Sequence, residues 1–169
     1  MKQIQNQIYF AYGSNMNREQ MEYRCPEATI IRVVRLEGYE LAFAGMAGNG
    51  VATIRPQEGS YVDGVLWRLT PECERYLDFY EGYPRFYGKE TLTVKDRLGG
   101  RHRAMAYVMN EPFCRSPAMP AKSYLQGILV GCDEHGLDKS PVQEAVQRAR
   151  QEIDAKTKTK EKKRSSRER

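Results

Sequence analysis

Short runs in which apolar and polar residues alternate occupy much of the chain between positions 7 and 109, and they predict β-strands. Most of the apolar positions in these runs carry β-branched or aromatic side chains, which suit a pleated, half-buried surface. Residues 29–45 have Glu37-Gly38 at their centre, which predicts two strands joined by a turn. The expected strands are residues 7–12, two within 29–45, residues 50–56 and 61–70, and two within 87–109 that meet at Leu98-Gly99-Gly100.

A second spacing, in which apolar residues recur every three or four positions, predicts helices. One helix begins at Thr70-Pro71, because threonine caps helix N-termini and proline suits the first helical position. We expect further helices at residues 17–25, at residues 121–130 and from Ser140-Pro141 onward, where Ser140 and Gln143 have the spacing of a capping box.

Together these elements predict an α+β fold, because hairpin-like strand pairs are interspersed with helices. We expect a small mixed β-barrel with flanking helices, built from residues 1–155 as one domain. The remaining segment, residues 156–169, contains no apolar residue. Such a segment cannot bury enough surface to offset the entropy of ordering it, so we expect a disordered basic tail.

Positive charge is concentrated at the C-terminal end of the chain. The chain carries a net charge of +5. Residues 145–169 hold ten Lys or Arg against four Asp or Glu, a net of +6, whereas residues 1–144 hold seventeen against eighteen, a net of −1. The expected domain therefore has no basic face that requires a polyanion, which argues against a nucleic-acid-binding protein.

The composition also indicates where the protein resides and whether it binds a metal. No apolar run approaches the roughly 18 to 20 residues of a membrane span, and the N-terminal residues 1–10 lack the apolar stretch of a signal peptide. We therefore expect a cytoplasmic protein whose four cysteines stay reduced. These cysteines form no C-x-x-C pair and only two histidines accompany them, so no metal site is expected.

The stretch YFAYGSNM, residues 9–16, places three small hydrogen-bonding residues where a strand gives way to a helix. Gly13 tolerates positive φ and lets another group approach the backbone closely. Free N–H groups at such a turn, assisted by the positive end of the following helix, can bind an anion, and Ser14 and Asn15 add side-chain donors. The turn thus predicts a site for a carboxylate or for the oxyanion of a carbonyl under attack. A simple capped turn remains the alternative, because Gly, Ser and Asn are common turn residues.

Glu81 ends an amphipathic helix just before Gly82. A carboxylate there faces the negative end of the helix dipole. Five aromatic residues surround it in the sequence, namely Phe79, Tyr80, Tyr83, Phe86 and Tyr87. Desolvation and the dipole would both raise the pKa of Glu81, which makes a glutamate a useful base or acid near neutral pH. A surface glutamate that merely ends a helix is the alternative, and nucleophilic catalysis has weaker support because no G-x-S-x-G elbow is present.

Taken in order, five motifs resemble those of the γ-glutamylcyclotransferase family. They are YFAYGSNM at 9–16, VATI at 51–54, GVLW at 64–67, LDFYEG at 77–82 and SYLQGILVGCDEHGLD at 123–138. The resemblance covers residues 8–140, and the ordered arrangement is more specific than any single motif. It implies a small mixed barrel with flanking helices and an enzyme that needs neither a metal nor another cofactor.

The resemblance also implies a reaction and its residues. The reaction is release of 5-oxoproline from a γ-glutamyl amino acid or related γ-glutamyl amide by intramolecular attack of the α-amine. Glu81 matches the catalytic glutamate, the general base and acid, and Tyr124 matches a tyrosine that contacts substrate. The substrate-binding turn is matched by Tyr9, Phe10, Ala11, Tyr12, Gly13, Ser14 and Asn15.

Several alternatives stay open at the level of the sequence. The leaving group can be an amino acid, an amine or an acyl carrier, and the turn YGSN favours the first or the last because related γ-glutamylamine enzymes usually have a different turn. The basic tail could contact an acidic carrier protein, although a solvated tail without function is the simpler interpretation. The sequence does not decide whether the chain forms a homodimer. A non-catalytic small-molecule binding protein on the same fold is the rival hypothesis, and Glu81 in its expected context argues against it.

Overall fold

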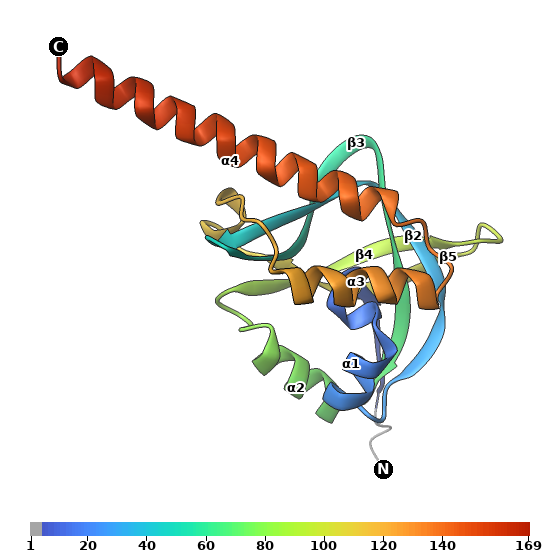
Figure 1. The fold of residues 1–169 in the computed structure, drawn as a ribbon. Coiled ribbons are helices and arrows are strands. Elements are labelled where there is room, and N and C mark those ends of the chain that lie inside the picture. The colour runs from blue at the N-terminus through green and yellow to red at the C-terminus, as the bar shows by residue number, and fades with distance from the viewer. Residues whose placement is uncertain (1–4) are drawn as a thin grey trace.

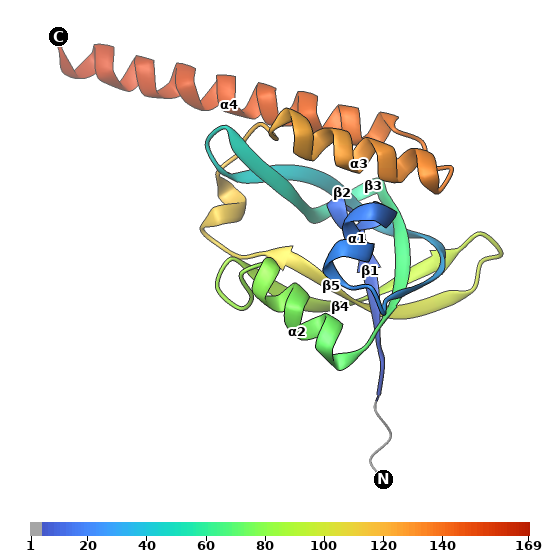
Figure 2. The same cartoon turned by 60° about the horizontal axis from the view of Figure 1, so that its bottom comes forward.

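A closed barrel of five strands with helices around it forms the computed structural model, which describes residues 5–169 (Figure 1). The strands are β1 (Gln7–Ala11), β2 (Thr29–Met46), β3 (Asn49–Leu69), β4 (Tyr87–Asp96) and β5 (Arg101–Met109). The α-helices are α1 (Arg18–Arg24), α2 (Pro71–Tyr80), α3 (Lys122–Glu134) and α4 (Ser140–Arg167), and the 3₁₀ helices are η1 (Ser14–Met16) and η2 (Phe113–Arg115). Helices α2 and α4 lie on opposite sides of the barrel (Figure 2).

The barrel is mixed, which confirms the predicted fold class. The strands follow the order β1-β3-β2-β4-β5 around the barrel. Strand β1 closes it, because Tyr9 pairs antiparallel with Trp67 of β3 and parallel with Met105 of β5. The pairs β2–β3, β2–β4 and β4–β5 are antiparallel. The N-terminal strand and the turn that follows it are therefore held between two other strands of the barrel.

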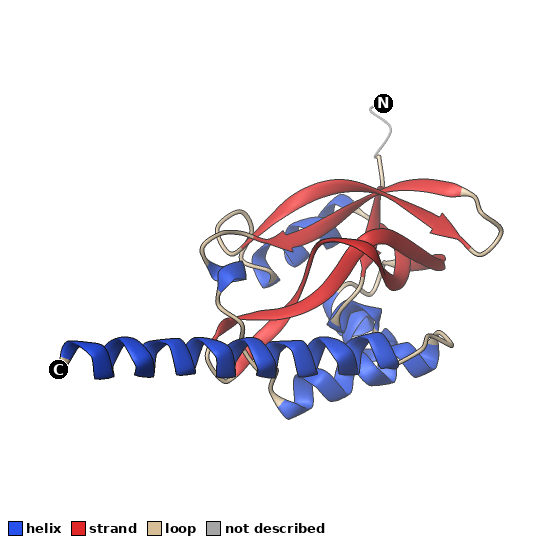
Figure 3. Cartoon of the chain, turned by 90° about the horizontal axis from the view of Figure 1, so that it is seen from above, coloured by secondary structure: helices blue, strands red, loops and turns tan. Residues whose placement is uncertain are grey.

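Two long strands replace the four short ones that the sequence predicted between residues 29 and 70. The expected turn at Glu37-Gly38 is wrong, because β2 continues through it and pairs with β3 on both sides. Gly38 has a φ of +80° and sits at an irregularity in the ladder, where Glu37 pairs with Tyr61 but Tyr39 pairs with Pro56. A glycine in this conformation bends a strand at a bulge without reversing it. The bend lets β2 and β3 curve around the barrel (Figure 3).

Helix α2 forms as the sequence predicted and carries the expected catalytic glutamate at its end. The Thr70 side chain accepts a hydrogen bond from the backbone N–H of Cys73 at 3.2 Å, so the predicted cap is present. Cys73 and Leu77 are buried against the core, whereas Tyr76 is 45% exposed. The buried face of α2 is thus narrower than the three-to-four-residue spacing of its apolar positions predicted. By contrast, no side-chain hydrogen bond caps α4 at Ser140.

The C-terminal segment is helical, which differs from the disordered tail that the sequence predicted. Helix α4 continues to Arg167, and all residues from Asp154 onward are exposed (Figure 1). The first half of the helix packs against β2. Once a helix is nucleated on a packed surface, each further residue adds one backbone hydrogen bond, and Lys, Arg and Glu are good helix formers. The predicted helical segment therefore extends into solvent without an apolar face.

Within residues 5–169, no helix is both long enough and apolar enough to cross a membrane. Over the same residues, no group of three or more His, Cys, Asp or Glu side chains is arranged to hold a metal ion. The four cysteines are free, and Cys25, Cys73 and Cys132 are buried.

Candidate active site

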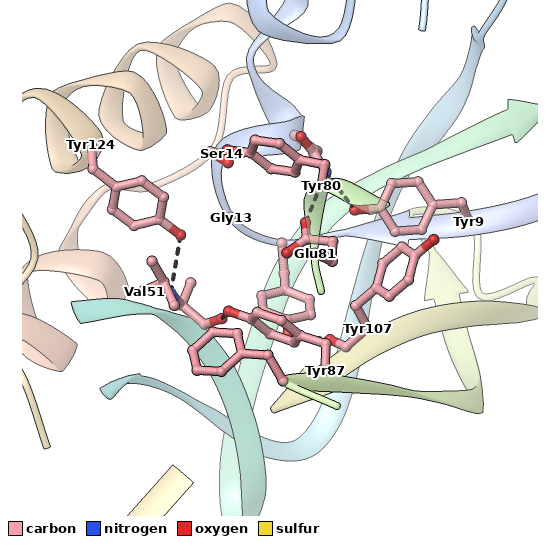
Figure 4. A pocket seen from close by; sticks show the side chains of 13 residues that line it. Tyr9, Gly13, Ser14, Val51, Tyr80, Glu81, Tyr87, Tyr107 and Tyr124 are labelled. Carbon is pink, nitrogen blue, oxygen red and sulfur yellow. Dashed lines mark hydrogen bonds between the residues drawn. The ribbon is translucent and has the colours of Figure 1, made fainter. Parts of the chain in front are cut away.

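A cavity of about 220 Å³ opens where the first strand, the turn after it and the end of α2 meet (Figure 4). It is lined by Tyr9, Tyr12, Gly13, Ser14, Asn15, Val51, Ala52, Tyr80, Glu81, Phe86, Tyr87, Tyr107 and Tyr124. Seven of the nine residues that the sequence singled out therefore share one cavity. The other two, Phe10 and Ala11, are buried and are not among its lining residues within the described part of the chain. The Phe10 ring lies instead against Gly64 of β3.

The turn at Gly13 approaches β3 closely. A Cβ atom on Gly13 would lie 3.1 Å from the Ala52 Cβ and 3.7 Å from the Tyr124 hydroxyl oxygen. Gly13 has a φ of −122°, so the close approach, and not a positive φ, favours glycine here. Within residues 5–169, no hydrogen bond is recorded from the backbone N–H groups of Gly13 and Ser14. These donors remain available to a ligand in the cavity.

The helix after this turn forms where the sequence predicted it, because α1 (Arg18–Arg24) lies between the caps Asn17 and Cys25. The short 3₁₀ helix η1 separates the turn from α1. The Asn17 side chain caps α1 by accepting from the N–H of Gln20 at 3.0 Å, and its Nδ2 donates to the Gly127 carbonyl at 3.1 Å. The positive end of the α1 dipole is therefore occupied by its own cap. Donors at the turn, and not the helix dipole, make it suitable for an anion.

Glu81 extends from the C-terminal end of α2 into the cavity (Figure 4). Its backbone N–H donates to the Leu77 carbonyl at 2.8 Å, and Gly82, with a φ of +63°, turns the chain away from the helix. Burial raises the pKa of the Glu81 carboxyl to about 7, while the Arg24 charge and a hydrogen bond from Asn15 act in the opposite direction. A carboxyl with such a pKa can both accept and release a proton near neutral pH.

Asn15 is the immediate partner of Glu81. Its Nδ2 donates to Oε1 of Glu81 at 3.3 Å and to the Tyr9 hydroxyl at 3.0 Å. Its Oδ1 accepts from Nη1 of Arg24 at 2.7 Å. Sequence reasoning missed Arg24, because an arginine in the last turn of a short helix is what the helix dipole favours and carries no other signal.

Six tyrosines line the cavity. Several of their hydroxyls hold backbone groups: that of Tyr87 donates to the Ala52 carbonyl at 2.6 Å, and that of Tyr124 accepts from the Ala52 N–H at 3.0 Å. Tyr12 donates to the Tyr107 carbonyl. Burial raises the pKa of Tyr9, Tyr12, Tyr87 and Tyr124 above the usual value for tyrosine, so these hydroxyls stay neutral. Among the lining residues in the described part of the chain, Glu81 is the one Asp, Glu, Lys, Arg or His.

The aromatic residues near Glu81 divide into two groups. Tyr80, Phe86 and Tyr87 line the cavity, as the sequence suggested. Phe79, however, is 87% exposed and Tyr83 is 39% exposed. A helix places successive residues on different faces, so neighbours of Glu81 in the sequence cannot all surround its carboxylate.

A polar network fixes the end of α2 against the barrel. Lys89 of β4 forms ion pairs with Glu74 at 2.9 Å and with Asp78 at 2.8 Å. Asp78 also accepts a hydrogen bond from the Tyr107 hydroxyl at 2.5 Å. Because Glu74 and Asp78 lie on α2 and Glu81 caps its C-terminal end, this network anchors the helix that carries Glu81. Sequence reasoning did not find this network, because charge spacing along the chain does not show which side chains of α2, β4 and β5 meet.

Comparison with known proteins identifies the family of the chain. A family model described as γ-glutamyl cyclotransferase, AIG2-like, matches residues 9–126. The γ-glutamylcyclotransferase of Mus musculus is 33% identical over 138 residues, which cover 77% of this chain and 72% of the relative. The corresponding protein of Homo sapiens is 31% identical over the same shares. A solved structure named γ-glutamyl cyclotransferase matches with a TM-score of 0.74 at 29% identity, covering 85% of this chain and 87% of that one. The chain therefore belongs to the γ-glutamylcyclotransferase, AIG2-like family of enzymes.

Proposed function

We propose that this enzyme releases 5-oxoproline from a γ-glutamyl amino acid or a related γ-glutamyl amide, with Glu81 as general base and acid. The observation that carries the proposal is the position of Glu81: a carboxyl with a pKa of about 7 lies in one cavity with the free backbone donors of the Gly13 turn. The family and its named relatives support the class of reaction. The substrate is inferred from the resemblance to this family, and the chemistry of the cavity supports the roles proposed for the residues.

The substrate contains both reacting groups, so the enzyme has only to fold it and move protons. The α-amine and the γ-carbonyl carbon are spaced to close a five-membered ring, and the intramolecular attack needs no covalent enzyme intermediate. Glu81 in its ionised form takes a proton from the α-ammonium group. The free amine then attacks the γ-carbonyl carbon, a C–N bond forms, and negative charge develops on the carbonyl oxygen.

The second half of the reaction returns the proton. As the oxyanion collapses, the bond to the leaving nitrogen breaks, and the protonated Glu81 donates to that nitrogen. The ring nitrogen loses its second proton to the leaving amine by the same carboxylate. Two protons thus leave the α-nitrogen and two reach the product amine, and Glu81 ends in its starting state.

The donors of the turn suit the charges of this substrate. The N–H groups of Gly13 and Ser14 can donate hydrogen bonds to either the developing oxyanion or the α-carboxylate, since both are anionic oxygens. The Tyr124 hydroxyl, which already accepts from Ala52, has its own proton left to donate into the cavity. No Lys, Arg or His is among the lining residues of the described chain, so backbone and hydroxyl groups take this role.

The direct test is 5-oxoproline release from a panel of substrates, measured for the wild type beside Glu81→Gln. The panel contains γ-glutamyl amino acids, a γ-glutamyl amine and a γ-glutamyl-acylated carrier mimic, so the best substrate also identifies the leaving group. Gln is nearly isosteric with Glu but cannot take the proton, so we expect at least about a hundredfold loss of kcat in a folded protein. A Glu81→Gln variant that keeps most of its rate would contradict the role of Glu81. Substrate binding without product from the wild type would support a non-catalytic binding protein.

A further inference from the structure

Arg24 contacts the site from behind the cavity wall. It ends α1, is partly buried, and is not among the lining residues. Its Nη1 donates to Oδ1 of Asn15 at 2.7 Å and its Nη2 donates to the Tyr80 hydroxyl at 2.6 Å. The guanidinium group also lies over the Tyr80 ring, 4.0 Å from its centroid. Three contacts therefore hold this cation between the turn and the end of α2.

The contact with Asn15 determines which end of that amide faces Glu81. All polar atoms of the buried Asn15 side chain are used, because Nδ2 donates to Tyr9 and Glu81 while Oδ1 accepts from Arg24. If the amide rotated by half a turn, Oδ1 would face the Glu81 carboxylate and the NH₂ group would face the guanidinium. Both contacts would then join like partners, acceptor to acceptor and donor to donor. Arg24 thus locks the productive orientation.

In this orientation the two carboxylate oxygens of Glu81 have different environments. Oε1 accepts from Asn15, whereas no hydrogen bond to Oε2 is recorded within residues 5–169. A carboxylate with one oxygen held by a donor presents the other to the cavity for proton transfer. An oxygen that already accepts from an amide is the poorer site for a proton, so the proton is carried on Oε2.

We propose that Arg24 is a positioning residue for the cyclisation, acting on Glu81 through the Asn15 amide without touching the substrate. The proposal rests on the proposed function, in which Glu81 moves the protons. In this proposal the Asn15 side chain orients Glu81, and the other residues of the turn bind the substrate. The charge of Arg24 adds a second effect in the same direction, because it favours the ionised form that accepts the first proton.

The groups around Glu81 allow the effect of Arg24 on its pKa to be measured. The tyrosines electrostatically coupled to it are Tyr9 from β1, Tyr12 from the turn, Tyr87 from β4 and Tyr124 from α3. Burial raises the pKa of each of them, so they stay uncharged through the neutral range. Arg24 is the charged group that acts on Glu81. A change in the acid limb of the pH profile on removing Arg24 therefore reports on this one pair.

The experiment compares the full-length wild type with Arg24→Gln, Arg24→Lys and the control Arg18→Gln. Arg18 is exposed on the same helix, so its variant removes the same charge without altering the contacts of Asn15. We measure kcat and KM separately from pH 5 to 9. For Arg24→Gln we expect kcat to fall about tenfold with little change in KM, and the acid limb to move up by about one pH unit. Arg24→Lys should restore the limb but not the whole of kcat, because an ammonium group lacks the fork that reaches both partners.

Other outcomes would overturn the proposal. A loss confined to KM would mean that Arg24 binds substrate, and an unchanged kcat with an unchanged acid limb would mean that it has no role. Infrared titration of the Glu81 carboxyl, taken as the difference from Glu81→Gln, gives a second readout that needs no turnover. If the wild type released no 5-oxoproline, the proposed function would fail, whereas an Arg24→Gln variant with an unshifted titration would refute the Arg24–Glu81 link by itself.

Discussion

The Nδ2 atom of Asn15 donates a hydrogen bond to Oε1 of Glu81 at 3.3 Å, although the two residues are 66 positions apart in the chain. Asn15 belongs to the turn after the first strand, and Glu81 ends the helix that follows the third. The barrel brings these two segments together by closing β1 between β3 and β5. The protonation of the expected base therefore depends on a contact between two motifs that each resemble an ordinary turn and an ordinary helix end.

The first prediction concerns the pH dependence of the reaction. Glu81 must be ionised to take the first proton, and its pKa is raised to about 7, so kcat/KM should rise through this pH and fall about tenfold per unit below it. We would measure the profile with two γ-glutamyl substrates whose α-amines differ in pKa. An acid limb near the same pH with both substrates would show that a group of the enzyme titrates there. A limb that follows the substrate amine would contradict the assignment to Glu81.

The second prediction concerns stability. Folding raises the pKa of Glu81 from its ordinary 4.5 to about 7, so ionised Glu81 destabilises the fold. This penalty is absent below pH 4.5, grows as the pH rises, and is complete above 7. Glu81→Gln should therefore increase the free energy of unfolding by about 3 kcal/mol at pH 8 and by little at pH 4.5. Thermal unfolding at both pH values tests this, with Glu58→Gln at an exposed position as the control.

The third prediction concerns the close approach at the turn. Gly13→Ala would place a Cβ 3.1 Å from the Ala52 Cβ and push the turn from β3. Because backbone donors must be placed within a fraction of an ångström, we expect kcat/KM to fall at least about tenfold. Adding Ala52→Gly removes the atom that is met, so the double variant should recover part of the lost activity. Full activity of Gly13→Ala alone would show that the spacing between turn and strand does not matter.

The fourth prediction concerns the C-terminal helix. The exposed part of α4 beyond Ala155 contacts the body through Lys156, whose ammonium group donates to the Arg115 carbonyl. Truncation after Ala155 removes this part and leaves Arg148 and Glu152, which bond to Leu41 and Arg55. We expect the activity of the truncated chain to stay within about twofold of the full chain. A larger loss would extend the functional domain beyond Ala155, and binding to nucleic acid that disappears on truncation would assign such binding to the tail.

Local patterns in the sequence were sufficient for elements that depend on short-range chemistry. The Thr70 cap, the hairpin of β4 and β5 and the helix at residues 122–134 all form near their predicted positions. The turn at Glu37-Gly38 was wrong because a glycine with positive φ serves a bulge as well as a reversal, and only the partner strand distinguishes the two. The tail differed because a charged segment that cannot pack can still extend a helix already formed.

The sequence by itself determined two groups capable of the chemistry: a glycine turn with free donors and a glutamate at the end of an aromatic-flanked helix. Side-chain type and local spacing are properties of the chain alone, so these could be read before any fold was known. Tyr124 was implied only by the resemblance to the family. Only the tertiary structure decided that Phe10 and Ala11 lie outside the cavity lining. It also decided that the Asn15 side chain donates to Glu81 and accepts from Arg24. Burial and hydrogen bonds between distant segments exist only after the barrel closes, and they set the pKa of Glu81.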